Sequence, residues 1–87
     1  MNTTEWQEFI ANTIKNYDLY GRSFTMGVAL YEGVMNGALF DEYDTIKDMI
    51  EEWTGKEYNT LRGAVEDSDL SLLDEIAREL CGENEEE

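Results

Sequence analysis

Hydrophobic residues recur at helical spacing along most of the chain, and the clearest stretch is residues 39–53. Read as an α-helix, this stretch places its apolar side chains on one stripe: Leu39, Tyr43, Ile46, Ile50 and Trp53. At about 100° per residue, four acidic residues fall together on the opposite side, and Glu51 lies at their edge: Asp41, Asp44, Asp48 and Glu52. Carboxylates at such spacings repel by a few tenths of a kcal/mol per pair. The sequence therefore predicts an amphipathic helix whose apolar stripe supports an acidic face.

The same helical period predicts a first helix over residues 5–17. Thr4 followed by Gln7 is typical of a capping box at a helix start, and Gly21 supplies a stop. Between these signals the apolar residues follow one another at helical spacing: Trp6, Phe9, Ile10, Ile14 and Tyr17.

Residues 23–36 fit two patterns. Their apolar residues alternate near the start, as in a half-buried strand over about residues 23–31, but they also fit a helix that Ser23 would cap. The helix prediction is preferred because no second strand is visible elsewhere in the chain for the first to pair with. Asn36-Gly37 then forms the C-terminal stop.

The remaining helices are shorter. Residues 56–65 predict a short helix after the Thr54-Gly55 stop, and residues 66–69 predict a turn. Ser68 or Asp69 then caps a last helix, which Gly82 closes and which five apolar residues mark: Leu70, Leu73, Ile76, Ala77 and Leu80. The predicted fold is all-α, a compact bundle of four to five short helices in one domain over residues 1–82, with a frayed acidic tail over residues 83–87.

Charge is the most unusual property of the composition. Six basic residues against 21 acidic residues give a net charge of −15, whereas small domains usually stay within about 2–8 charges of zero. The imbalance is uneven, since residues 1–40 carry −2 and residues 41–87 carry −13. Such a surface repels nucleic acids and anionic membranes and attracts basic partners.

Several kinds of chemistry are excluded by residue type. The chain has no histidine and one cysteine, Cys81, so it lacks histidine-based triads, an internal disulfide and an ordinary zinc site. Asp67, Asp69 and Ser71 resemble the start of a calcium loop, but Leu72 and Arg78 occupy positions that need glycine and glutamate. We expect a binding protein with no cofactor or metal, and not an enzyme. The single cysteine, the absence of a long apolar run and the absence of a basic signal sequence favour the cytoplasm.

We expect a basic nucleic-acid-binding protein to be the partner, because carboxylates one helical turn apart recur at about 6 Å, close to the spacing of backbone phosphates at roughly 6–7 Å. The candidate partner-binding residues are acidic: Asp41, Asp44, Asp48, Glu51, Glu52, Asp67, Asp69, Asp74, Glu75 and Glu79. The prediction is a protein that inhibits by occupying a groove built for DNA or RNA.

In size, charge and its acidic ending, GENEEE over residues 82–87, the chain resembles the small, cysteine-poor DNA-mimic inhibitors of phages and mobile elements. The resemblance spans residues 41–87, and because no motif defines the group, no residue role carries over. It implies stoichiometric inhibition, without turnover, of a host-defence nuclease or a CRISPR effector in the cytoplasm of a bacterial host cell.

Two other readings stay open. The same acidic surface suits an adaptor module that binds a basic protein unrelated to nucleic acid, and it also suits a structural protein whose charge serves solubility alone. A homodimer would also fit the composition, because the number of large apolar side chains can exceed what a core of this size buries.

Overall fold

The computed structural model describes residues 2–17 and 25–82. They form α1 (Thr3–Tyr17), α2 (Thr25–Met35), a 3₁₀-helix η1 (Phe40–Glu42), α3 (Tyr43–Thr54), α4 (Leu61–Asp67) and α5 (Leu70–Leu80), with no strand in these two ranges. The all-α prediction is confirmed. The alternative strand is wrong over residues 25–31, which are helical, whereas the Gly21 stop and the tail over residues 83–87 lie outside the described residues.

α1 begins two residues before the predicted start because a different capping box forms. Asn2 Oδ1 accepts a hydrogen bond from the backbone N–H of Glu5 at 2.8 Å, and the backbone N–H of Asn2 donates to Glu5 Oε1 at 3.1 Å. This reciprocal pair satisfies two backbone donors at the helix end. The prediction of a capping box at the start of this helix was therefore correct, but its residues were wrong: Asn2 and Glu5 form it in place of Thr4 and Gln7.

Three of the predicted glycine stops are confirmed. Gly37, Gly55 and Gly82 have φ values of +83°, +76° and +73°, in the left-handed region where a side chain is strained. They end α2, α3 and α5, so each of these helices stops where the sequence indicated.

The stretch at residues 39–53 is helical in two pieces. Leu39 is buried, η1 follows it, and the regular α-helix begins only at Tyr43. Ile46 and Ile50 are fully buried, as the stripe predicts, but Trp53 is 41% exposed. Trp53 occupies the last turn of α3, and the prediction that it belongs to the core was wrong.

α4 is displaced from its predicted range. It begins at Leu61 because the Thr60 backbone is extended and the Thr60 side chain accepts a hydrogen bond from the Gly63 N–H at 3.1 Å. It extends to Asp67, so the first half of the predicted turn is helical. Asp69 caps α5 as expected, accepting a hydrogen bond from the Leu72 N–H at 3.0 Å.

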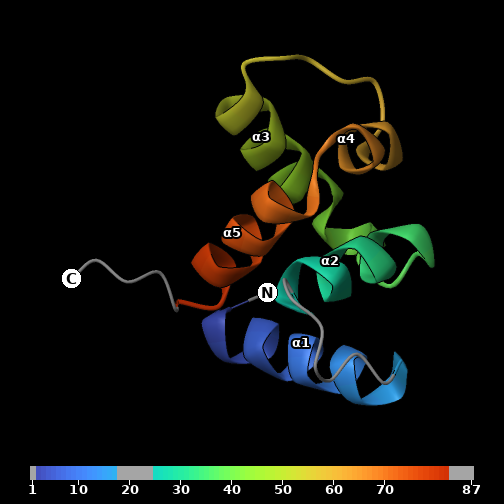
Figure 1. The fold of residues 1–87 in the computed structure, drawn as a ribbon, viewed down its shortest axis with the longest axis vertical. Coiled ribbons are helices and arrows are strands. Elements are labelled where there is room, and N and C mark those ends of the chain that lie inside the picture. Colours follow the sequence, from blue (N-terminus) through green and yellow to red (C-terminus); the bar gives the residue numbers. More distant parts are fainter. Residues whose placement is uncertain (1, 18–24, 83–87) are drawn as a thin grey trace.

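α2 and α5 form the centre of the molecule, with α1 at one end and α3 and α4 at the other (Figure 1). The α2 and α5 backbones approach closely at Gly27, where a Cβ atom would lie 2.7 Å from the Asp74 nitrogen. Every α-helix contributes side chains to one hydrophobic core, and α2 and α5 supply many of them: Ala29, Leu30, Val34, Leu73, Ile76 and Ala77. Packing of this core fixes the directions in which the acidic side chains of α3 and α5 point.

Candidate partner-binding surface

The acidic row predicted on α3 is present on its exposed side. Asp44, Asp48 and Glu52 follow one another at intervals of four residues and are exposed, and Asp41 is exposed in the preceding η1. Within residues 2–17 and 25–82, none of the four forms a hydrogen bond through its carboxylate or an ion pair with a base. We refer to these four residues as the α3 carboxylate row.

Glu51 does not extend this row, because it stabilises the connection between α3 and α4. Its Oε2 accepts a hydrogen bond from Lys47 Nζ at 2.8 Å and another from the backbone N–H of Tyr58 at 2.9 Å. The Lys47 hydrogen bond, followed by the Tyr58 hydrogen bond, lowers the pKa of Glu51. The same contact with Glu51 raises the pKa of Lys47.

Asp67 holds the other end of the same connection. Its Oδ2 accepts a hydrogen bond from the Tyr58 hydroxyl at 2.7 Å and lies 3.4 Å from Lys56 Nζ. The Tyr58 hydrogen bond and the Lys56 charge lower the pKa of Asp67, and the hydrogen bond to Asp67 raises the pKa of Tyr58. Asp67 remains exposed, so its second oxygen can still face a partner.

Asp74 does not lie on the surface, and its inclusion among the partner-binding residues was wrong. It is 6% exposed, its Oδ1 accepts a hydrogen bond from the Gly27 N–H at 3.2 Å, and its Oδ2 lies 2.8 Å from Arg78 Nε. The carboxylate thus satisfies a backbone donor in the first turn of α2 from the neighbouring helix α5. Helical spacing places Asp74 next to the apolar stripe of α5, four residues after Leu70, and α2 packs so closely there that this acidic position falls inside the contact.

The other two candidates on α5, Glu75 and Glu79, are exposed. Asp69 is exposed as well, although its side chain caps the helix. The predicted set therefore divides into residues that hold the fold together, namely Glu51, Asp69 and Asp74, and residues whose charge faces solvent. Asp67 belongs to both groups.

The bases of the acidic half are all engaged within the fold. Lys47, Lys56 and Arg78 pair with Glu51, Asp67 and Asp74, respectively. Arg62 donates to the backbone carbonyl oxygen of Met35 at 2.6 Å. No base forms an ion pair with the α3 carboxylate row in the described part of the chain, and the Lys47 charge, which acts on Asp48, is bound to Glu51.

Large aromatic side chains lie at both ends of this row, and sequence reasoning missed them. Phe40 is 75% exposed beside Asp41, and Trp53 is 41% exposed beside Glu52. The available signal was the position of Phe40, which lies off the apolar stripe. Exposed aromatics next to charged groups are typical of protein interfaces, where they bury large areas with little loss of conformational freedom.

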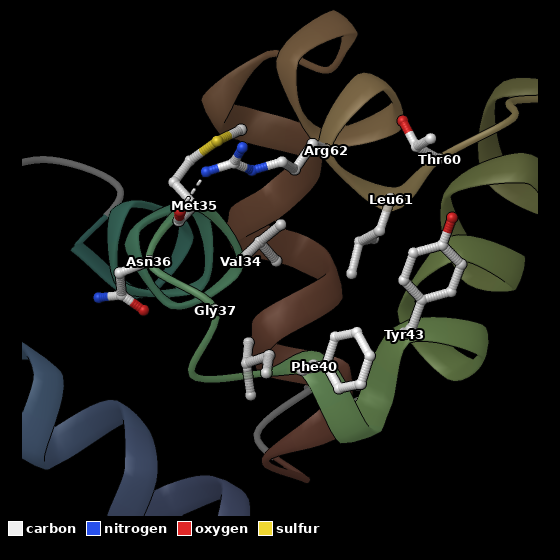
Figure 2. Close-up of a pocket in the computed structure, with 10 residues that line it drawn as sticks. Val34, Met35, Asn36, Gly37, Phe40, Tyr43, Thr60, Leu61 and Arg62 are labelled. Carbon is white, nitrogen blue, oxygen red and sulfur yellow. Dashed lines mark hydrogen bonds between the residues drawn. The ribbon is translucent and has the colours of Figure 1, made fainter.

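Phe40 also borders an apolar cavity, which has a volume of about 430 Å³. The cavity lies between the C-terminal end of α2, η1, and the first turns of α3 and α4, and Figure 2 shows its lining residues. The apolar part of the lining is Val34, Met35, Leu39, Phe40, Tyr43 and Leu61, with Asn36, Gly37, Thr60 and Arg62 completing it. Leu61 points into the hollow toward Phe40, and the Tyr43 ring lies beside them (Figure 2).

Comparison with protein-family models, curated proteins and solved structures found no match to this chain. Among the described residues, no three cysteine or acidic side chains gather in a way that could hold a metal ion. In the same residues, no helix has the length and apolar character needed to cross a membrane.

Proposed function

We propose that this protein is a non-enzymatic inhibitor that binds a basic nucleic-acid-binding protein, such as a host-defence nuclease or a CRISPR effector, by presenting carboxylates where that protein expects phosphates. The α3 carboxylate row is the observation that carries this proposal. Its members are exposed, are spaced by single helical turns of about 6 Å, and form no ion pair within the described residues. A groove that is lined with lysine and arginine would attract such a row.

The distribution of the bases supports a binding role over a role in solubility alone. Net charge serves solubility wherever it is placed, so solubility gives no reason to leave one exposed row without ion pairs. Here the four bases of residues 41–87 bind other acidic residues or a backbone carbonyl oxygen within the fold, and the α3 carboxylate row keeps its negative charge.

A second candidate function is an adaptor that binds a basic protein unrelated to nucleic acid. The exposed Phe40 and Trp53 favour it, because an imitation of the phosphate backbone needs charge and not apolar anchors. The two functions differ in one measurable respect: nucleic acid displaces a mimic from its partner but does not displace an adaptor.

The experiment is a pull-down with the whole chain as bait from lysate of a candidate host, at low and high salt, with and without duplex DNA and single-stranded RNA. We expect a basic nucleic-acid-binding protein to be retained at low salt and released by nucleic acid. The triple variant Asp44→Asn, Asp48→Asn, Glu52→Gln should lose the capture.

The matched control changes net charge by the same amount at exposed acids outside the predicted surface: Glu8→Gln, Glu57→Gln and Glu66→Gln. Equal losses from both triple variants would show that bulk charge is sufficient and would contradict a defined surface. A partner that is retained through high salt and is indifferent to nucleic acid would overturn the mimic and support the adaptor.

A further inference from the structure

We propose that the cavity between α2, η1, α3 and α4 receives an apolar side chain carried on a basic segment of the partner. The proposal rests on the proposed function and adds an anchor to it. Salt-dependent attraction by the α3 carboxylate row would bring the partner to the surface, and burial of one apolar side chain in the cavity would set the register of the complex.

The cavity has the size and lining of a binding pocket. Its volume of about 430 Å³ lies within the range of about 300–1,000 Å³ that ligand pockets occupy. Tyr43 and Leu61 form its walls, and the exposed Phe40 lies at its edge (Figure 2). An apolar side chain that enters the cavity would contact these groups and would no longer be in contact with water. Removal of apolar surface from water is favourable.

The charged residues around the cavity favour a basic partner segment as its occupant. Asp41 follows Phe40, and Asp44 follows Tyr43, so exposed carboxylates adjoin the lining on the η1 and α3 side. Arg62, on the α4 side, donates to the Met35 carbonyl at 2.6 Å, and its charge therefore lies at the C-terminal end of α2, where it offsets the helix dipole.

A basic segment is therefore favoured over the other occupants. An anionic amphiphile would have to approach a chain of net charge −15. A second copy of this chain would bring the same charge against itself, which opposes self-association at low salt.

Two short lysine-rich peptides with blocked ends, one with phenylalanine and the other with alanine at its centre, test the proposal. Each is titrated into the ¹⁵N-labelled full chain at about 50 mM salt, where screening is weak. We expect the phenylalanine peptide to bind about tenfold more tightly, as is usual for an anchor residue. It alone should shift the amide resonances of Phe40, Tyr43 and Leu61.

Phe40→Ala is the test variant, and Leu70→Ala is the matched control outside the candidate surface; both side chains are exposed, so both variants should fold. Phe40→Ala should reduce the preference for the phenylalanine peptide to about twofold, and Leu70→Ala should leave it unchanged. Equal affinity for the two peptides would overturn the anchor while leaving the acidic surface intact. Binding of neither peptide would contradict both the anchor and the proposed function. Resonances at the cavity that shift with protein concentration alone would assign the cavity to a second copy and overturn the proposal.

Discussion

Replacing Asp74 by alanine tests whether this carboxylate holds the fold together, and the adjacent Glu75 provides a matched control. Asp74 is 6% exposed, accepts a hydrogen bond from the Gly27 N–H and pairs with Arg78, whereas Glu75 is exposed. Each substitution to alanine removes one carboxylate from the same helix and changes net charge equally. Any difference in stability therefore reports what the carboxylate contacts.

The expected loss follows from these two contacts. A buried hydrogen bond to a charged group contributes about 1.5–3 kcal/mol. The Arg78 side chain is 50% exposed, so water screens the ion pair and limits its contribution to about 0–1 kcal/mol. The better helix propensity of alanine returns about 0.5 kcal/mol. We expect Asp74→Ala to lower the free energy of unfolding by about 2 kcal/mol, which lowers Tm by about 8–16 °C in a domain of this size.

Urea denaturation followed by far-UV circular dichroism measures both variants. Glu75→Ala should change the free energy of unfolding by less than about 0.5 kcal/mol, as most surface substitutions do. Asp74→Asn should lie between, because the amide oxygen can still accept from Gly27 although the charge is lost. Equal effects of Asp74→Ala and Glu75→Ala would refute the reasoning.

Three further predictions concern the packing of α2 against α5, the loop between α3 and α4, and the Cys81 thiol. Gly27→Ala should destabilise the fold by about 1–2 kcal/mol in the same urea assay, because its Cβ would lie 2.7 Å from the Asp74 nitrogen and overpacking outweighs the gain in helix propensity. Tyr58→Phe removes the hydrogen bond that lowers the pKa of Asp67 below its ordinary value of 3.8. Because a depressed carboxyl pKa contributes stability above the unfolded-state pKa, the stability difference between wild type and Tyr58→Phe should be full at neutral pH. It should shrink as pH falls below about 3.8 in acid titrations of the two proteins, and a difference that grows there would contradict the assignment. The Cys81 thiol is 1% exposed, so a thiol-specific reagent should modify it at least about 100-fold more slowly in the native than in the urea-unfolded protein, and rapid native labelling would show that the site opens.

Periodicity and glycine positions were sufficient to predict most of the fold. The helix over residues 23–36 was chosen over a strand because a lone strand has no partner, and the structure confirms a helix over Thr25–Met35. Gly37, Gly55 and Gly82 marked three helix ends because only glycine adopts their left-handed backbone without strain. These signals depend on residues that are close together in the chain, and therefore they can be recognised from the sequence alone.

The features that the sequence did not reveal depend on contacts between helices. Trp53 continues the apolar stripe of α3 but is 41% exposed, since burial depends on what packs against the last turn as well as on spacing. Asp74 is the opposite case, an acidic residue buried because α2 needs an acceptor for the Gly27 N–H. The cavity beside Phe40 is bounded by residues from four elements, and no local pattern in the chain brings those elements together.

The α3 carboxylate row forms no ion pair within the described residues because Lys47, the base on the same helix, pairs with Glu51. Within a helix, Lys47 can reach Asp44 three residues before it or Glu51 four residues after it, and an acid on the N-terminal side gives the more favourable order. The structure nevertheless pairs Lys47 with Glu51, which also accepts the Tyr58 N–H and so fixes the loop between α3 and α4. Lys47 therefore forms its ion pair with Glu51 and none with the row, although its charge still acts on Asp48. Asp44, Asp48 and Glu52 are left to repel one another by a few tenths of a kcal/mol per pair, against the stability that the buried Ile46 and Ile50 supply. A basic partner bound to this row would relieve that repulsion, so the same residues that weaken the free helix would favour the proposed complex.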